Sequence, residues 1–431
     1  MLPLYFLAQI LAALVGWPFA LVLRLRRPDK FRRLCARLRQ TPPIAPTGRK
    51  RIWLHALSVG EISSAAPLAR AIRGRFPDAF LVITVATASG ETLARRILTN
   101  VADVILPAPL DWLPTVRRHL RRLRPDVFIL VETDFWPGLL FSLKRENIPA
   151  MLVNGRISAA SFARFHHFQA LFLPMFSCFS RLAMQTVADR DRMAAFGIDP
   201  RRLPVLGNLK YAAEQPGISA EAVAALLPPK RLWVCGSTHP GEEEIIFTVF
   251  RRLRHRVPDL LLVLAPRHPE RGQELAALAT ACGLVAWRRS QATACRTDKN
   301  RQAAVPDCEV FILDSIGELA ACYFLADITF IGGSLTPEGG HNPLEAAWAG
   351  KAILFGRHME DFAEIAADLT ACDAARMVED GDDLSAALAQ LLAEPQAAHQ
   401  MGEAALALAQ ARRQGVLTGH LDALTELLTI R

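Results

Sequence analysis

Short apolar segments rich in β-branched residues alternate with helical segments along most of the chain, and this alternation constrains the fold most strongly. One series begins at 51–57 (RIWLHAL) and runs to about Leu206. A second begins at 231–236 (RLWVCG) and continues through the apolar runs 260–266 and 328–333. Repeated strand–helix units build parallel sheets that are covered by helices on both faces. We therefore predict an α/β protein with two Rossmann-like domains.

The chain of 431 residues is long for one core and sufficient for two. We expect an N-terminal domain over 51–211, a linker over 212–229, a C-terminal domain over 230–395 and helices over 396–431. Ligands of open parallel sheets bind beyond the carboxyl ends of the strands. Two such domains therefore predict a central cleft with the functional groups in the loops on either side.

The positive charge of the chain is confined to a segment near the N-terminus. Residues 24–51 contain eleven Lys or Arg and one acid, so this segment accounts for more than the total net charge of +8. We expect no nucleic-acid partner, because the rest of the chain is slightly acidic. Residues 2–23 carry no charge and are long enough to cross a bilayer.

We therefore predict a membrane-anchor helix over 1–23 and a basic juxtamembrane segment over 24–50 that contacts anionic lipid. Positive charge beside a span stays on the cytoplasmic side, which predicts a protein body at the cytoplasmic face of the inner membrane. A cleaved signal peptide does not fit, because the basic residues follow the apolar run. A helix lying in the membrane interface is an open alternative, since Gly16 and Pro18 weaken a straight span.

Polar loops with acidic residues follow two predicted strands of the N-terminal domain. Ser58, Gly60 and Glu61 come directly after the first strand, and Glu61 begins a helix. A carboxylate at this place is suited to act as a general base, although a helix-capping acid would have the same pattern. Glu132 and Asp134 follow the strand 126–131. They are candidates for binding an acceptor or for tuning the base by like-charge coupling.

The C-terminal domain has glycine-containing or basic loops after five successive predicted strands. Such loops suit a phosphate, because helix N-termini and Arg side chains bind anions. Together they predict a nucleotide-sugar site. Its candidate residues are Ser237, Arg267, His268, Gly317, Glu318, His341, Asn342 and Glu345.

Several common motifs are missing from the sequence. It contains no GxxxxGK[ST] sequence, and no GxGxxG opens the first strand–helix unit, which argues against a P-loop kinase and a dinucleotide dehydrogenase. The acidic triplets at 189–191 and 380–382 imitate a metal-binding DxD motif, but we expect them to be surface charge. The eight cysteines are scattered and are expected to be buried thiols in a reducing compartment.

Six phenylalanines recur every three or four residues between Phe162 and Phe179 and therefore share one helical face. Arg156, Arg164 and two histidines lie at the start of this segment. Core packing would explain the aromatic face. A contact with acyl chains or a membrane, with cations at its edge for a phosphate, is the alternative.

Eight ordered motifs resemble those of the Kdo (3-deoxy-D-manno-octulosonic acid) transferases of lipopolysaccharide assembly. They are WLHALSVGE, VETDFWP, NGRIS, GNLK, GSTHPGEEE, APRHPER, DSIGEL and IGGSLTPEGGHNPLE. The resemblance extends from the N-terminus to about residue 370. It implies a GT-B fold, CMP-Kdo as the donor with no further cofactor, a lipid A precursor as the acceptor, and inversion at the anomeric carbon without a metal.

The resemblance also implies roles for individual residues. Glu61 matches the catalytic base of the family, and Glu132 its second essential carboxylate. The cytidine nucleotide is expected to contact Arg267, Gly317, Glu318, Asn342 and Glu345. Ser237, His268 and Lys210 are expected to contact the phosphate or the Kdo carboxylate. Acceptor contacts are expected from Ser58, Gly60, Asp134, Arg156 and Ser161.

The sequence departs from the family pattern on the acceptor side. The family usually has Glu at Asp134, Asn at Gly138 and Ala at Gly155. The identity of the acceptor and the number of Kdo units are therefore less firmly implied than the donor. Two other functions are alternatives: a membrane-associated GT-B enzyme that uses a UDP-sugar, and a catalytically silent binding protein.

Overall fold

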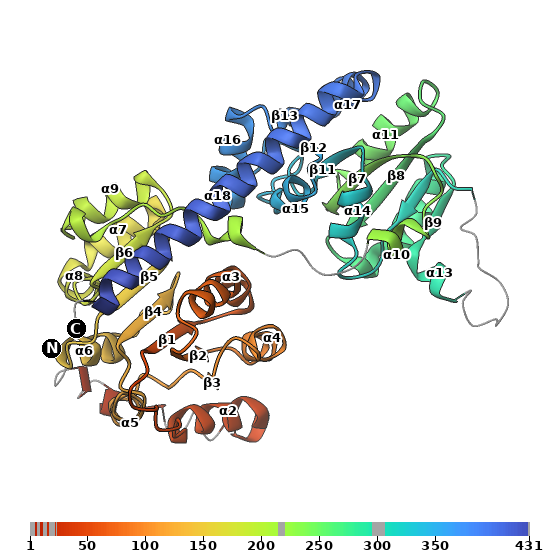
Figure 1. Cartoon of the computed structure of the whole chain (residues 1–431). Helices are drawn as coiled ribbons and strands as arrows, with labels where there is room; N and C mark the ends of the chain where they lie inside the picture. Colours follow the sequence, from red (N-terminus) through yellow and green to blue (C-terminus); the bar gives the residue numbers. More distant parts are fainter. Residues whose placement is uncertain are drawn as a thin grey trace. The chain divides into compact units, whose positions relative to one another are not determined.

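The computed structural model describes residues 5–6, 9–11, 15–16, 22, 24–213, 220–294 and 307–429 (Figure 1). The chain divides into two compact units. The first consists of Met1–Ala213 with Arg412–Arg431, and the second of Glu214–Ala411. Each unit contains a parallel sheet, as the alternation of strand and helix segments predicts.

The first unit is built on a six-stranded parallel sheet in the order β3-β2-β1-β4-β5-β6. Its strands are β1 (Arg51–Ala56), β2 (Phe80–Val85), β3 (Val104–Pro107), β4 (Val127–Val131), β5 (Ala150–Gly155) and β6 (Arg181–Met184). The strand order reverses between β1 and β4, which are hydrogen-bonded neighbours. Open α/β sheets bind ligands beyond the carboxyl ends of the strands at such a switch point.

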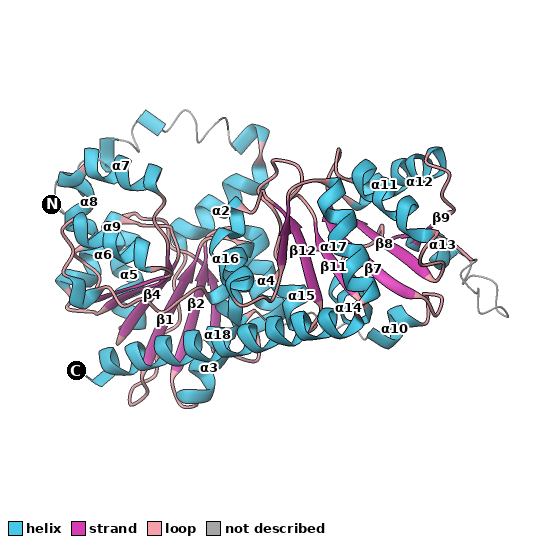
Figure 2. Cartoon of the chain, turned by 90° about the horizontal axis from the view of Figure 1, so that it is seen from above, coloured by secondary structure: helices cyan, strands magenta, loops and turns pink. Residues whose placement is uncertain are grey.

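Helices cover both faces of this sheet (Figure 2). They are α2 (Pro28–Arg39), α3 (Val59–Arg75), α4 (Ala88–Leu98), α5 (Leu113–Leu123), α6 (Pro137–Arg145), α7 (Ala159–His167), α8 (Gln169–Phe176) and α9 (Val187–Ala195), with 3-10 turns η1 (Pro200–Arg202) and η2 (Leu209–Ala212). Side chains of α3, α4 and the end of α18 (Pro395–Thr429) fill one core. Those of α5, α6, α8 and α9 fill the other.

The second unit is built on a seven-stranded parallel sheet in the order β13-β12-β11-β7-β8-β10-β9. Its strands are β7 (Arg231–Thr238), β8 (Leu260–Pro266), β9 (Ala286–Arg288), β10 (Val310–Ile312), β11 (Ile328–Ile331), β12 (Ala352–Gly356) and β13 (Arg376–Val378). The strand order reverses between β7 and β11, which are hydrogen-bonded neighbours. The switch point of this sheet therefore lies beyond Thr238 and Ile331.

The helices of the second unit connect these strands. They are α10 (Ala220–Ala224), α11 (Glu243–Arg254), α12 (Gly272–Ala281), α13 (Arg289–Ala294), α14 (Leu319–Leu325), α15 (Leu344–Trp348), α16 (Ala363–Ala371) and α17 (Gly381–Ala393), with η3 (Pro269–Arg271) and η5 (Glu360–Phe362). The segment expected as C-terminal helices is the 35-residue helix α18. Its residues up to Ala411 belong to the second unit and the remainder to the first.

The membrane-anchor prediction falls largely outside the described residues, as do residues 214–219 of the predicted linker. Within the described ranges, no helix is both long enough and apolar enough to cross a bilayer. Two described residues of the N-terminal segment contact the first unit. The Tyr5 hydroxyl donates to Asp111 Oδ2 at 2.7 Å, and the Phe6 ring lies 5.5 Å from the Trp112 ring.

The phenylalanine-rich segment is mainly part of the core. It forms α7 and α8, which are separated at Phe168. Phe176 and Phe179 are fully buried, and the Phe135 ring packs against both, at 5.1 and 6.2 Å between centroids. Phe168 is the exception, with 54% of its surface exposed. Core packing therefore explains most of the aromatic face, and it also anchors Phe135 in the loop that follows β4.

Candidate active site

Glu61 lies at the switch point of the first sheet, in the first turn of α3. The Ser58 side chain caps this helix by accepting a hydrogen bond from the Glu61 backbone N–H at 3.4 Å. The Glu61 side chain is nearly buried. Its Oε1 accepts a hydrogen bond from Thr133 Oγ1 at 2.7 Å, and its Oε2 accepts one from the Leu57 backbone N–H. The loops after β1 and β4 therefore meet at this carboxylate.

Burial raises the pKa of the Glu61 carboxyl above its ordinary value, because the charged form loses hydration. The hydrogen bonds from Leu57 and Thr133 oppose this effect by stabilising the charged form, and the negative charge of Glu132 adds to it. A carboxylate with a raised pKa accepts a proton more readily than an exposed one. This is the property that a general base near neutral pH requires.

Glu132 is held by a buried asparagine that is itself fixed by the loop before η2. Its Oε1 accepts a hydrogen bond from Asn154 Nδ2 at 2.5 Å. Asn154 is fully buried at the end of β5, and its Oδ1 accepts a hydrogen bond from the Leu209 backbone N–H at 2.9 Å. Asn208 Nδ2 donates to Gln185 Oε1 at 3.2 Å in the same cluster. The sequence motifs NGRIS and GNLK therefore contribute supports for this carboxylate.

Asp134 is directed into the protein. Its side chain is 7% exposed, and its Oδ2 lies 2.9 Å from Nε2 of the buried His55. Burial by itself raises the pKa of Asp134, but the hydrogen bond with His55 and the positive charge of Arg37 outweigh burial, so its pKa is below the ordinary value. Asp134, which was expected to contact the acceptor, therefore uses at least one carboxylate oxygen for a hydrogen bond within the first unit.

The remaining residues expected near the acceptor lie in loops and helix starts of the first unit. Gly60 is exposed in the first turn of α3, and Arg156 is exposed after β5. Ser161 is half-buried at the start of α7, where its backbone N–H donates to Ser158 Oγ at 3.1 Å. Lys210 lies in η2.

Asp189 was expected to be surface charge, and that interpretation is wrong. Its side chain is buried, and its Oδ1 accepts a hydrogen bond from the Ile157 backbone N–H at 2.8 Å. It also contacts Thr186, which caps α9. A sequence triplet does not reveal this role, since the two partners lie some thirty residues apart in the sequence.

A cavity of about 270 Å³ lies in the second unit beside the ends of its central strands. It brings together five of the candidate residues for the nucleotide-sugar site, namely Ser237, Arg267, His341, Asn342 and Glu345. Leu319, Tyr323 and Phe362 complete its lining. Burial raises the pKa of Glu345, and a hydrogen bond from Asn342 opposes this shift. An arginine, two amide or hydroxyl groups and a carboxylate can together bind a phosphate and a ribose.

Three other predicted donor residues are not among those that line this cavity. His268 is exposed, and its Nδ1 lies 3.5 Å from Glu270. Gly317 is exposed with a positive φ of 91°. Glu318 pairs with Arg289 at 2.9 Å, in the position that precedes α14. Leu319, the next residue, does reach the cavity.

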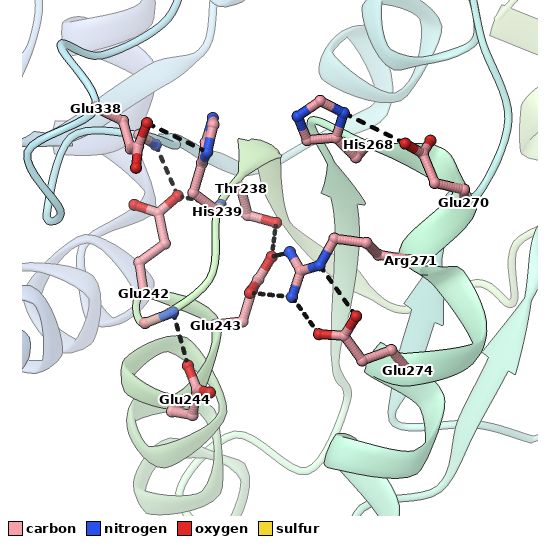
Figure 3. A network of polar contacts seen from close by, with 12 residues as sticks. Thr238, His239, Glu242, Glu243, Glu244, His268, Glu270, Arg271, Glu274 and Glu338 are labelled. Carbon is pink, nitrogen blue, oxygen red and sulfur yellow. Dashed lines mark hydrogen bonds and ion pairs between the residues drawn. The ribbon is translucent and has the colours of Figure 1, made fainter.

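Two buried glutamates support the loops around the cavity (Figure 3). Glu242 Oε1 accepts hydrogen bonds from the backbone N–H groups of His239, at 2.9 Å, and Gly333, at 2.7 Å. Burial raises the pKa of Glu242 to about 7. Glu243 accepts hydrogen bonds from Thr238 and from Arg271, the latter at 2.8 Å. The acidic run in GSTHPGEEE is therefore a scaffold for the switch point of the second sheet.

His239 and His341 form a close pair at the edge of the cavity. Their Nε2 atoms are 2.8 Å apart, and their rings stack with a centroid distance of 5.0 Å. Burial and the neighbouring His239 lower the pKa of His341 to about 4. Because one Nε2 must donate and the other accept, the pair is compatible with two neutral rings.

Sequence reasoning did not assign roles to His55, Asn154, Tyr323 or Glu242. A signal existed for His55, because it is a polar residue within an apolar strand whose neighbours are all buried. Buried polar groups generally have hydrogen-bond partners, so a side-chain hydrogen bond of His55 could have been predicted. The partner itself depends on strand register, which pairs His55 with Thr84.

Two doubly wound parallel sheets, each with polar loops at its switch point, are typical of the class of proteins with a GT-B-like fold. Solved structures support this fold. A UDP-GlcNAc 2-epimerase from Neisseria meningitidis bound to UDP-GlcNAc matches with a TM-score of 0.60 and 12% identity over 87% of this chain and 99% of that chain. A glycosyltransferase from Rickettsia africae matches with a TM-score of 0.59 and 11% identity over 88% and 99%.

Sequence relatives narrow the class to one family. The family model described as 3-deoxy-D-manno-octulosonic-acid transferase (kdotransferase) matches residues 31–213. The 3-deoxy-D-manno-octulosonic acid transferase of Haemophilus influenzae is 32% identical over 384 residues, which cover 88% of this chain and 87% of that protein. The chain therefore belongs to the Kdo transferase family of glycosyltransferases, and the resemblance of its eight motifs is confirmed.

Proposed function

We propose that the protein transfers Kdo from CMP-Kdo to a lipid A precursor, with inversion and without a metal or other cofactor. Glu61 is the general base. The observation that carries this proposal is the nearly buried Glu61 carboxylate, which two hydrogen bonds fix at the switch point of the first sheet. Family membership supports Kdo as the transferred sugar. The cavity with Arg267 supports an anionic nucleotide donor.

The reaction has a simple balance of bonds and protons. An acceptor hydroxyl attacks the anomeric carbon of Kdo, the bond from that carbon to the phosphate oxygen breaks, and CMP leaves. Glu61 takes the hydroxyl proton. Arg267 stabilises the negative charge that develops on the departing phosphate. Asn342 and Glu345 orient the nucleotide, and Glu345 is placed to accept hydrogen bonds from the ribose.

The acceptor and the membrane are assigned to the first unit. Gly60, Arg156 and Ser161 are at the carboxyl ends of β1 and β5, where an acceptor sugar would reach Glu61. Arg24, Arg26, Arg27 and Lys30 are exposed and would contact anionic lipid at the cytoplasmic face of the inner membrane. Arg33 and Arg37 of the same basic segment instead bond to Glu91, at 2.9 Å, and to the Ala108 carbonyl, at 2.8 Å.

The decisive experiment compares the wild-type protein with Glu61→Gln, which keeps the size of the side chain and removes its basicity. Transfer from CMP-Kdo to a tetra-acylated lipid A precursor is followed by mass spectrometry, which also counts the Kdo units. We expect a loss of at least about 10²-fold in kcat. CMP should raise the melting temperature of both proteins, and UDP should not, because only a ligand that binds the folded state stabilises it.

Full activity of Glu61→Gln would refute the assignment of the base. Protection by UDP and not by CMP would favour a UDP-sugar enzyme. Protection by CMP with no transfer by the wild-type protein would favour a catalytically silent binding protein.

A further inference from the structure

A chain of buried side-chain hydrogen bonds runs through the first sheet and ends on the turn 132–134. Trp53 Nε1 donates to Thr84 Oγ1 at 2.8 Å, and that oxygen lies 2.9 Å from His55 Nδ1. All three side chains are at most 1% exposed.

The chain has a direction that follows from the donors. An indole N–H can only donate, so Thr84 Oγ1 accepts from Trp53. The Asp134 carboxylate can only accept, which places a proton on His55 Nε2, and in the neutral ring Nδ1 then accepts from the Thr84 hydroxyl. That N–H donates to Asp134 Oδ2 at 2.9 Å. The order of donors thus presents a fixed N–H group to the turn.

The turn that receives this hydrogen bond has an unusual backbone. Glu132 and Asp134 have positive φ values of 55° and 69°, in the left-handed region that residues other than glycine rarely adopt. Such conformations persist only where surrounding contacts hold them. The contacts here are the His55–Asp134 hydrogen bond and the hydrogen bond from Asn154 to Glu132.

Thr133 lies between these two residues and transmits the geometry of the turn to Glu61. Its hydroxyl donates to Glu61 Oε1 at 2.7 Å. If the turn relaxed, this hydroxyl would move, and one of the two hydrogen bonds that fix the Glu61 carboxylate would be lost. The orientation of Glu61 therefore depends on Asp134, although the Asp134 side chain is bonded to His55 and not to Glu61.

We propose that His55 and Asp134 are a positioning pair for sugar transfer, which locks the turn 132–134 so that Thr133 holds Glu61 in its reactive orientation. Asp134, which the sequence assigned to acceptor contact, acts through the turn instead. The inference rests on the proposed role of Glu61 as the base. It adds a function for two residues that do not touch the reacting atoms.

The experiment measures kcat, KM for both substrates and the pH dependence of kcat/KM for His55→Phe, Asp134→Asn and the double variant. His55→Phe keeps a ring and removes both ring nitrogens. The matched control is His119→Gln, because His119 is another buried histidine of the first unit, and its ring stacks on Trp53 at 6.2 Å. Thermal unfolding of each variant reports the loss of stability separately.

We expect kcat to fall by about 10²-fold in each single variant, since misplacing a catalytic group by about 1 Å has this effect. Both KM values should stay near those of the wild type. The kcat of the double variant should be no lower than that of the poorer single variant, because the two substitutions break the same hydrogen bond between His55 and Asp134. His55→Gln should restore part of kcat, since its amide can donate to Asp134. His119→Gln should lower stability and leave the kinetics unchanged.

The pH profile gives a readout that a merely structural role would not change. The charged groups that face the turn and its base are Glu61, Glu132, Asp111 and Arg37, besides the pair itself. The Thr133 hydrogen bond lowers the pKa of Glu61. Losing it would raise that pKa, so the acid limb of kcat/KM should move to higher pH in His55→Phe and not in His119→Gln.

Wild-type kcat and an unshifted acid limb in a folded His55→Phe protein would overturn the inference. If that variant does not fold, the same result for Asp134→Asn would do so. A rise only in KM for the lipid acceptor would show that Asp134 contacts the acceptor directly. Glu61→Gln in the same series separates the two proposals: if it is inactive while His55→Phe is fully active, only the positioning role fails.

Discussion

At the scale of single residues, burial raises the proton affinity of three glutamates near the two switch points. Glu61 in the first unit and Glu242 and Glu345 in the second all have raised pKa values, with burial as the largest cause. Their partners differ. Glu61 is held by one hydroxyl and one backbone N–H, whereas Glu242 accepts two backbone N–H groups and supports a loop. A raised proton affinity therefore serves different purposes at the two sites.

Glu242→Gln tests this interpretation through the pH dependence of stability. The pKa of Glu242 is raised from 4.5 to about 7 on folding, so the folded state binds its proton more tightly than the unfolded state. Stability should therefore fall as the pH rises from about 5 to about 7, by up to about 3 kcal/mol from this group.

Gln imitates the protonated acid and should remove this contribution. We expect the free energy of unfolding of Glu242→Gln, measured with urea at pH 5 and pH 8, to vary less with pH than that of the wild type. Equal pH dependence in the two proteins would contradict a raised pKa. Glu274→Gln is the control, because Glu274 is exposed and its pKa is lowered by Arg271 rather than raised.

At the scale of elements, the first turn of α6, which follows the turn 132–134, packs tightly against Asp111. The Asp111 carboxylate accepts hydrogen bonds from the backbone N–H groups of Gly138, at 2.9 Å, and Leu139, at 2.8 Å, and so caps α6. A Cβ at Gly138 would lie 2.6 Å from Asp111 Oδ1. The glycine at this position therefore leaves room for the Asp111 carboxylate.

A double-mutant cycle tests the dependence of Gly138 on Asp111. Asp111→Ala should destabilise the protein by about 1–2 kcal/mol, because α6 loses its cap. Gly138→Ala should cost about 1–3 kcal/mol through overcrowding. In the Asp111→Ala background the same substitution should cost much less, since the crowded atoms are gone.

The free energies of unfolding in urea give these values. Gly74→Ala in α3 is the control, because a Cβ there meets no atom within 4 Å, and it should be neutral or stabilising. Strictly additive effects of Gly138→Ala and Asp111→Ala would contradict the steric explanation.

At the scale of the whole molecule, the polypeptide distributes its functions between two units that share the helix α18. The proposed base and acceptor loops belong to the first unit, and the proposed nucleotide cavity belongs to the second. The N-terminal segment adds the proposed membrane attachment. Its described residues also contact the first unit, through Tyr5 with Asp111 and Phe6 with Trp112.

Deletion of residues 1–23 separates attachment from chemistry. We expect the truncated protein to retain most of its transfer activity on a detergent-solubilised acceptor, because the contacts of Glu61 do not involve this segment. Binding to anionic vesicles, measured by sedimentation, should weaken. The remaining binding should be salt-sensitive, since exposed basic side chains account for it. Loss of turnover in a folded truncated protein would show that the N-terminal segment supports the active site. The Tyr5–Asp111 hydrogen bond would then be the first contact to test by substitution.

The sequence predicted the outline of the molecule from local patterns. Alternating apolar strands and helices gave two parallel sheets, since that pattern depends on each segment alone. The glycine-containing loops of the second unit identified Ser237, Arg267, Asn342 and Glu345, which the structure brings to one cavity. This was possible because the carboxyl ends of parallel strands share one edge, so sequence position implies proximity.

Other roles depend on contacts between distant segments, and no local pattern reveals them. Asp134 carries the same carboxylate whether it faces an acceptor or His55, and only the register of β1 against β4 decides which. The sequence pattern suggested that Asp189 is surface charge, but in the folded protein it is buried and accepts a hydrogen bond from the Ile157 backbone N–H. The amino-acid sequence by itself thus determined the family and the two sheets, and it supplied the candidates for the reactive groups. The tertiary structure decided which of those groups are buried, which partners they receive and hence their proton affinities, because burial and hydrogen bonding are properties of the packed chain.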